Sequence, residues 1–238
     1  MMKIGILLVG RASEDLVDEY GTYAEMLIAL INTGEQVFEF KTFNILDDEF
    51  PKDHLECDGW IVTGSPHGVY EDHSWIPTVS QLINNVYEAN LPIFGVCFGH
   101  QLIAQALGGH VEKSEKGWGL GLHTYQVNNK PDYMSNLSEE VTLNICHQDQ
   151  VLRPPQGATV YAKSEFCENA GFYIKDKVLT MQAHPEFLVD FTKALLTARR
   201  DVTIPKEFVD PALVGLKNNP DSVQSNEFAK TVRQFFLA

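Results

Sequence analysis

Basic residues are scarce in this sequence, which holds 18 Lys and Arg against 32 Asp and Glu and has a formal net charge of -14 at pH 7. A protein that binds a phosphate backbone needs Lys and Arg gathered on one surface. The charge balance is strongly the other way, so we expect no nucleic-acid partner. An acidic balance otherwise mainly favours solubility.

Long apolar runs and paired-cysteine motifs are also missing. No uninterrupted apolar run approaches the ~20 residues that a membrane span requires, so we expect no membrane partner. No C-x-x-C spacing occurs, and no basic segment followed by an apolar core and a cleavage site precedes the first apolar run. We therefore expect a reduced, cytoplasmic protein. Its four cysteines are Cys57, Cys97, Cys146 and Cys167.

The first half of the chain alternates strand-like and helical patterns. A length of 238 residues with 44% hydrophobic content suits one large α/β domain. The pattern predicts an open, doubly wound, mostly parallel sheet of the flavodoxin-like kind, which binds ligands beyond the carboxyl ends of its strands. The expected strands are 3–9, a run beginning at 37, 59–63 and 93–96, and the expected helices are 20–31, one starting near 74 and one starting at 100.

After Gly109 the pattern changes to short strand-like runs without intervening helices. These runs predict an antiparallel layer added to the parallel one. The segment from Lys113 to Gly121 is rich in glycine and charge, which indicates a mobile loop near the site rather than a domain linker. The runs are 122–127, 141–146, 159–162, 172–174 and 178–182.

A cysteine lies between a predicted strand and a predicted helix, in the pattern Gly95-x-Cys97-x-Gly99. This is the cysteine form of the nucleophile elbow, in which small residues two positions away on either side permit a sharp turn. The helix N-terminus favours the reactive thiolate form of Cys97. The alternative is that Cys97 is a small buried apolar residue in a glycine-containing turn.

A second motif, His184-Pro185-Glu186, follows the apolar run 178–183. Residues two apart share a face of an extended chain, so Glu186 can hold one ring nitrogen of His184 while the other faces a thiol. With Cys97, these residues supply the order nucleophile, base and orienter that covalent catalysis needs.

The segment G-V-C-F-G-H-Q with a downstream H-P-E resembles the class I glutamine amidotransferase family, whose members use a Cys-His-Glu triad. The resemblance runs from about Met2 to about Phe187. It implies cleavage of a γ-glutamyl amide through a cysteine thioester, with Cys97, His184 and Glu186 as the triad. It also implies that residues 1–187 form the amidotransferase domain, while residues 188–238 form a helical extension packed on the same domain.

Further roles follow from the resemblance. The family's loop after the strand 59–63 supplies one backbone N–H to the oxyanion hole, and the residue after the nucleophile, here Phe98, supplies the other. Many members have two consecutive glycines in that loop, whereas this chain has Gly64-Ser65, so the inward-facing amide stays open. Gln148, Asp149 and Gln101 match positions that contact substrate, although the Asp149 side chain could instead be a surface turn residue.

The extension shows a helical pattern after Phe187, then a polar connection with Pro205, Pro211 and Pro220, and a last helical stretch from Phe228 to Leu237. We expect it to pack over the sheet edge; a dimer contact or a partial lid is the alternative.

No metal or cofactor is expected. His67, His100 and His147 are interpreted as structural or rim histidines, because none has a second ligand at metal spacing. The expected partner is a small-molecule substrate, either glutamine or another γ-glutamyl compound.

No P-loop or second catalytic domain occurs in the chain, so it is either a glutaminase subunit for a separate ammonia-accepting synthetase or a free-standing hydrolase. Its motifs look similar to those of stand-alone amidotransferase-like proteins and of plant γ-glutamyl peptidases. A binding subunit without catalysis is the remaining alternative.

Overall fold

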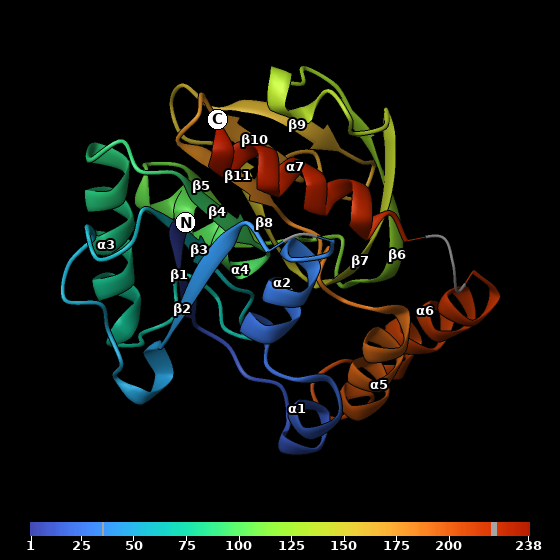
Figure 1. Cartoon of the computed structure of the whole chain (residues 1–238). Coiled ribbons are helices and arrows are strands. Elements are labelled where there is room, and N and C mark those ends of the chain that lie inside the picture. The colour runs from blue at the N-terminus through green and yellow to red at the C-terminus, as the bar shows by residue number, and fades with distance from the viewer. Residues whose placement is uncertain (35, 220–222) are drawn as a thin grey trace.

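The computed structural model describes residues 1–34, 36–219 and 223–238, and a nine-stranded sheet crosses the molecule in the order β2-β1-β3-β4-β11-β10-β9-β6-β7 (Figure 1). Neighbours from β2 to β11 pair in parallel, and neighbours from β11 to β7 pair antiparallel. The strands are β1 (Met2–Leu8), β2 (Phe38–Asn44), β3 (Gly59–Val62), β4 (Ile93–Val96), β6 (Gly119–Val127), β7 (Glu140–His147), β9 (Thr159–Lys163), β10 (Gly171–Ile174) and β11 (Val178–Met181).

Helices cover both faces of the parallel half. On one face α3 (Trp75–Glu88) and α4 (Phe98–Ala106) pack against β3 and β4 in one apolar cluster, and on the other face α2 (Tyr23–Ile31) lies in a second cluster (Figure 1). The strands β3, β4 and β11 are buried along their whole length. A continuous apolar run without alternation is the pattern of a strand covered on both faces. The predicted doubly wound α/β fold is confirmed.

The helix expected over 20–31 is interrupted. Tyr20 ends a separate helix, α1 (Glu14–Tyr20), and Gly21 turns the chain with a φ of 82°. Thr22 then caps α2, because its side chain accepts from the Glu25 N–H while the Glu25 carboxylate accepts from the Thr22 N–H. The apolar periodicity alone did not reveal this capping box.

The expected addition of antiparallel strands is confirmed, and most of these strands do not form a sheet of their own. They continue the central sheet, and the run 178–182, expected among them, forms β11 and pairs in parallel with β4. A tight reversal at Lys175 (φ 45°) returns the chain from β10, so β11 lies between β10 and β4. A second, two-stranded antiparallel sheet joins β5 (His110–Lys113) and β8 (Asp149–Arg153).

The C-terminal segment contains α5 (Val189–Arg199), α6 (Lys206–Asn218) and α7 (Ser225–Leu237). The expected polar connection is wrong, because Pro205 caps α6 and Pro211 lies inside that helix. A proline inside a helix loses one backbone hydrogen bond without always ending the helix. Pro220 lies outside the described residues. The described residues also form two short 3-10 turns, η1 (Ile45–Asp47) and η2 (Asp132–Met134).

Helix α7 packs on the sheet face that also carries α2 (Figure 1). Its Phe228 ring lies 6.1 Å from Phe94 of β4, and its Phe236 ring lies 5.9 Å from Phe38 of β2. The end of the chain therefore contributes side chains to the main apolar core.

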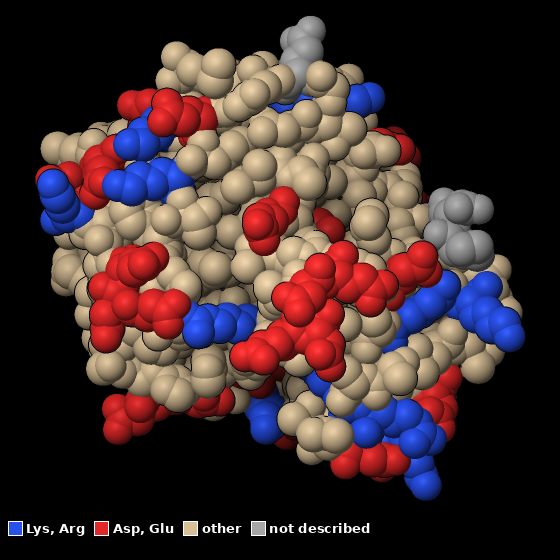
Figure 2. All heavy atoms as spheres, turned by 60° about the horizontal axis from the view of Figure 1, so that its bottom comes forward, with Lys and Arg blue, Asp and Glu red and all other residues tan. Residues whose placement is uncertain are grey.

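Charge and hydropathy in the structure agree with the composition. Within the described residues, no helix has both the length and the apolar character that crossing a membrane would take. On the face drawn in Figure 2, Asp and Glu side chains gather near the middle, with Lys and Arg distributed around them.

Candidate active site

The strand β4 turns into helix α4 at a single residue, Cys97. Its φ of 51° and ψ of -104° lie outside the ordinary regions for a residue with a side chain. The turn can be this tight because both flanking residues are glycines, which can come close to the backbone atoms of other residues. A Cβ on Gly95 would lie 2.6 Å from the Gly99 carbonyl oxygen, and a Cβ on Gly99 would lie 2.2 Å from that of Val62. The predicted elbow geometry is present in the structure.

The strand β11 lies beside β4 and carries the second motif to the elbow. The Cys97 N–H donates to the Met181 carbonyl at 2.8 Å, so the two strand ends are joined at this cysteine. Beyond β11, the His184 N–H donates to the Asn144 carbonyl at 2.8 Å, and the Asn144 side chain donates to the Phe187 carbonyl at 2.8 Å. These bonds hold the segment 184–187 in place.

His184 connects the thiol to a buried carboxylate. Its Nδ1–H donates to Glu186 Oε1 at 2.7 Å. The ring lies close enough to Cys97 for that side chain to raise the pKa of His184. Both side chains are at most 5% exposed, and the Phe187 ring stacks on the imidazole with centroids 3.9 Å apart. Burial lowers the pKa of His184, but the charges of Glu186 and Cys97 outweigh it and raise that pKa to about 10. His184 is therefore an imidazolium at neutral pH.

The other three thiols differ from Cys97 in their surroundings. Burial raises the pKa of Cys57 and Cys146, and it raises the pKa of Cys167 to about 12. Such thiols stay protonated at neutral pH and react slowly. Cys146 nonetheless lines the same cavity as Cys97, so it is the natural comparison for thiol reactivity.

The candidate oxyanion donors surround the thiol. A Cβ on Gly64 would lie 2.8 Å from Cε1 of His184 and 3.8 Å from Cβ of Cys97, so Gly64 packs directly against both. Ser65 lines the cavity, and its Oγ accepts from the His67 N–H at 3.3 Å. Phe98 is the first residue of α4, where a backbone N–H has no partner within the helix.

A pair of buried amide side chains stands behind the thiol, one of which sequence reasoning missed. Gln182 Nε2 donates to Cys97 Sγ at 3.6 Å, and its Oε1 accepts from Gln101 Nε2 at 3.1 Å. The Gln101 amide also donates to the Asp149 carbonyl at 2.9 Å. Gln101 therefore ties Asp149 to the nucleophile through Gln182. The sequence signal that could have identified Gln182 is its position two residues before His184, because residues two apart on an extended chain share a face.

A cavity of about 170 Å³ opens in front of Cys97. The predicted substrate residues Gln101, Gln148 and Asp149 all line it. Burial raises the pKa of the Asp149 carboxyl, while a hydrogen bond from Tyr70 works against that shift. The other lining residues are Ser65, Pro66, His67, Gly68, Tyr70, Glu71, Lys113, Trp118, Cys146, His147 and Arg199.

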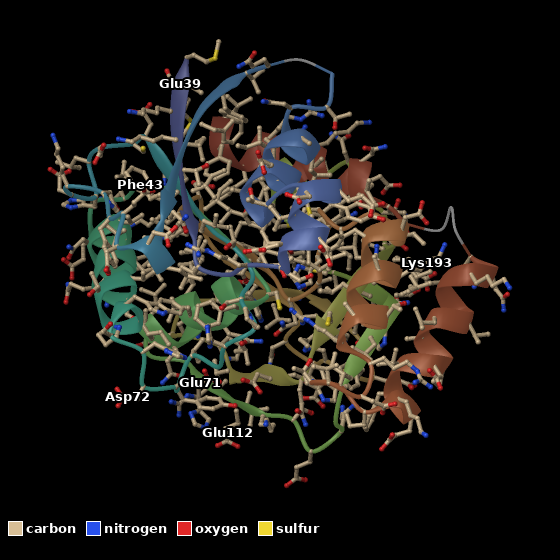
Figure 3. All side chains as sticks on the ribbon, turned by 90° about the horizontal axis from the view of Figure 1, so that it is seen from below. Glu39, Phe43, Glu71, Asp72, Glu112 and Lys193 are labelled. Carbon is tan, nitrogen blue, oxygen red and sulfur yellow. The ribbon has the colours of Figure 1, made fainter. Side chains whose placement is uncertain are left out.

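Two cations at the cavity wall were not named as site residues from the sequence, although Lys113 begins the charged segment that was expected near the site. Lys113 ends β5, and the half-buried Arg199 ends α5, beyond both motifs. Among the described residues no carboxylate pairs with Arg199, and its guanidinium donates to Cys146 Sγ at 3.6 Å. Figure 3 labels Glu71 on the β3–α3 connection and Lys193 on α5; Glu71 lines the cavity, whereas α5 reaches it through its last residue, Arg199.

The histidines outside the candidate triad have distinct positions. His100 is fully buried and its Nδ1 contacts Thr180 Oγ1 at 2.8 Å, and His147 Nδ1 donates to the Asp149 carbonyl at 3.1 Å. Both fit the structural interpretation. The expectation that His67 lacks a second ligand is corrected, since Glu71 and His73 lie beside it. The loop brings together side chains whose order in the sequence did not suggest a site.

Comparisons with known proteins agree with this geometry. The family model "Glutamine amidotransferase class-I" matches residues 15–199. Gamma-glutamyl peptidase 4 of Arabidopsis thaliana is 35% identical over 76% of this chain and 74% of its own length. A GMP synthase [glutamine-hydrolyzing] of Finegoldia magna is 33% identical over 54% of this chain and 24% of that protein. A solved glutamine amidotransferase of Thermotoga maritima has a TM-score of 0.77 at 18% identity, with 100% of this chain and 99% of that chain covered.

The doubly wound fold and the family match define a hydrolase of the amidotransferase class. The chain belongs to the class-I glutamine amidotransferase family. The resemblance read from the elbow and the H-P-E motif is confirmed, and so is the expected enzyme class, a hydrolase of γ-glutamyl amides.

Proposed function

We propose that this chain hydrolyses a γ-glutamyl amide bond through a thioester on Cys97, as a stand-alone amidotransferase-like enzyme. The observation that carries the proposal is the position of Cys97 at a strained elbow, next to the buried His184. His184 Nδ1 is in turn held by Glu186 Oε1 at 2.7 Å. These residues are arranged as nucleophile, acid-base and orienter.

The first half of the reaction forms the thioester. The Cys97 thiolate attacks the γ-carbonyl carbon, and the carbonyl electron pair moves onto oxygen. The backbone amides of Phe98 and of the Gly64-Ser65 connection stabilise that oxyanion. Collapse of this intermediate breaks the C–N bond, and the departing amine takes its proton from the imidazolium of His184. Loss of one oxyanion donor slows such reactions by about 10²–10³.

The second half releases glutamate. His184, now neutral, takes a proton from a water molecule whose oxygen attacks the thioester carbon. The C–S bond breaks, the thiolate of Cys97 returns and the γ-carboxylate leaves. Glu186 keeps Nδ1 protonated and stabilises the imidazolium, so Nε2 performs both proton transfers. The raised pKa of His184, about 10, suits its first task as an acid.

The cavity supports a γ-glutamyl substrate through charges of both signs. Asp149 is a carboxylate available to an α-ammonium group, while Arg199 and Lys113 are cations available to a carboxylate. We propose that Gln101 and Gln148 complete this contact, with Gln101 holding the Asp149 backbone in position.

A second candidate function is cleavage of γ-glutamyl peptides of the glutathione type. The half-buried Arg199 favours it, because this guanidinium could also bind the carboxylate of a peptide leaving group. The similarity to Gamma-glutamyl peptidase 4 agrees with this candidate.

Two further proposals concern the setting of the reaction. Ammonia could pass to a separate synthetase, as the match to one part of a GMP synthase suggests. We also propose a cytoplasmic location, because Cys57, Cys97, Cys146 and Cys167 are all free.

The test is incubation of the pure protein with glutamine and, separately, with glutathione, measuring free ammonia and free glutamate. Ammonia from glutamine alone supports the first candidate, and glutamate from glutathione supports the second. With an activated γ-glutamyl substrate, intact-mass spectrometry of His184→Ala should show a glutamyl adduct on Cys97 that hydroxylamine removes. An adduct on Cys146 or on a lysine, or none in a folded protein, would overturn the thioester mechanism.

A further inference from the structure

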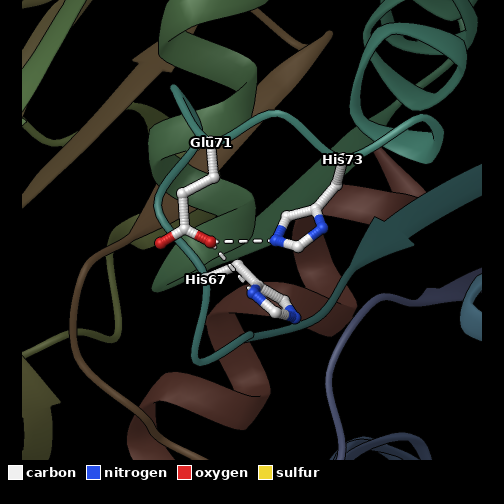
Figure 4. A group of neighbouring side chains, drawn as sticks. All are labelled: His67, Glu71 and His73. Atoms are coloured by element: carbon white, nitrogen blue, oxygen red, sulfur yellow. Dashed lines mark hydrogen bonds and ion pairs between the residues drawn. The ribbon is translucent and has the colours of Figure 1, made fainter.

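Three side chains of the β3–α3 connection point toward one another beside the cavity (Figure 4). Glu71 Oε2 lies 3.0 Å from His67 Nδ1 and 2.9 Å from His73 Nε2. The candidate ligand atoms of all three residues lie within 4.8 Å of one another. Glu71 therefore stands between the two imidazoles, and rotation of these exposed side chains can bring all three ligand atoms onto one ion.

This donor set has a definite chemical preference. Two imidazoles and a carboxylate suit zinc and similar divalent transition metals, whereas calcium and magnesium prefer oxygen ligands. A tetrahedral zinc ion with bonds of about 2.0–2.1 Å separates its ligand atoms by roughly 3.3 Å. The two observed separations from Glu71 Oε2 are shorter by a few tenths of an ångström. Side chains between 32% and 42% exposed can open by that amount.

Contacts around the cluster orient its ligands before any ion arrives. The His73 ring stacks on Trp75 with an interplanar angle of 15°, and Trp75 packs on Phe98 of α4. The Glu71 N–H donates to the Gly68 carbonyl at 3.0 Å, and the His73 N–H donates to the Glu71 carbonyl at 3.0 Å. A preorganised ligand set of this kind raises metal affinity, because less side-chain freedom is lost on binding.

We propose that His67, Glu71 and His73 form a binding site for one divalent transition-metal ion of the zinc type at the rim of the active-site cavity. The ion takes one bond from each side chain and leaves at least one position for solvent or another ligand. It replaces the two N–H to carboxylate hydrogen bonds with metal bonds and ties the segment 67–73 into a closed loop. His67 and Glu71 both line the cavity, so the ion adds positive charge at its mouth.

The test uses the full-length protein in a Cys97→Ser background, because a thiolate beside His184 can also bind zinc. The protein is stripped with a chelator and titrated with Zn²⁺ against a chromophoric competitor. We expect one ion per chain, with affinity reduced at least about tenfold by Glu71→Gln and by His73→Ala. Cobalt substitution should give a visible spectrum without the thiolate-to-metal band of a cysteine site.

The chain offers a matched control in His110 and Glu112, an exposed histidine–carboxylate pair at 2.5 Å that lies outside the three-residue cluster. His110→Ala should leave zinc affinity unchanged. Circular dichroism melts confirm that every variant is folded. A folded parent that takes up no zinc, or zinc that persists in Glu71→Gln/His73→Ala and disappears in Cys146→Ser, would overturn the proposal. Because the readout is metal binding, it is independent of whether γ-glutamyl hydrolysis is the correct reaction.

Discussion

At the scale of single residues, the properties of His184 depend on Glu186. Burial alone lowers the pKa of an imidazole, and here the negative charges around the ring reverse that effect and raise it to about 10. Because the pKa of His184 in the folded state lies above its ordinary value near 6.5, its ion pair with Glu186 contributes its full stabilisation of the fold below pH 6.5. The contribution is lost as pH rises through about 10.

The first prediction is that Glu186→Gln moves the alkaline limb of kcat/KM to lower pH by at least about one unit. Removing the carboxylate leaves burial to lower the pKa of His184, so the acid needed for amine departure is lost earlier. Turnover should fall less than in His184→Ala, since the base itself is kept. A pH–rate profile measures both effects. An unshifted limb in a folded variant would remove Glu186 from the triad.

The second prediction concerns Gln182, a positioning residue whose amide donates to Cys97 Sγ at 3.6 Å. Hydrogen bonds to charged groups contribute about 1.5–3 kcal/mol, so Gln182→Met should reduce kcat/KM roughly 10- to 100-fold. Gln182→Glu should be worse, because its carboxylate repels the thiolate. Iodoacetamide labelling of Cys97 at neutral pH should slow in the same order. Equal labelling in both variants would indicate a packing role only.

The third prediction is that Arg199→Met raises KM roughly 10-fold or more with little change in kcat, because a charge-assisted contact to a substrate carboxylate is lost. An effect on both glutamine and glutathione would assign the contact to the α-carboxylate. An effect on glutathione alone would assign it to the leaving group. The matched control is Arg200→Ala, whose guanidinium instead pairs with Asp210 at 2.7 and 2.9 Å. Unchanged KM for both substrates would contradict carboxylate binding.

At the scale of elements, the features that could be predicted from the sequence are those formed by residues close together in the chain. The elbow is encoded within five residues, 95–99, because glycine alone tolerates the contacts at 2.6 and 2.2 Å. The pairing of His184 with Glu186 follows from a two-residue spacing. The order of the strands in the sheet could not be predicted from the sequence. The pairing of β11 with β4 depends on tertiary packing, and a strand-like sequence pattern does not show whether its neighbour is parallel or antiparallel.

Other elements escaped prediction for specific physical reasons. Helix α6 continues through Pro211, so treating proline as a helix breaker was misleading there. Arg199 reaches the cavity from the end of α5, far beyond either motif. The division of the chain between residues 187 and 188 remains a proposal; the family match extends to residue 199 and so includes α5.

At the scale of the whole molecule, a formal charge of -14 surrounds a cavity that holds its own cations. Long-range repulsion of an anionic substrate acts over about one Debye length, roughly 30 Å at 0.01 M salt and 8 Å at 0.15 M. Contacts inside the cavity are screened far less. The net negative charge of the molecule therefore repels an anionic substrate at long range, whereas Arg199 and Lys113 attract its carboxylate inside the cavity. A substrate without net charge feels little of the long-range repulsion.

The last prediction follows from this difference. Glutathione carries an extra carboxylate and is anionic at neutral pH, whereas glutamine is a zwitterion without net charge. Raising the salt from about 0.01 to 0.15 M should increase kcat/KM for glutathione roughly two- to fivefold by screening the acidic surface, and leave that for glutamine nearly unchanged. Initial rates in sodium chloride at constant pH measure it, with a neutral osmolyte as control. A fall in kcat/KM for glutathione with added salt would mean that Arg199 and Lys113, rather than the acidic surface, control the approach of the substrate.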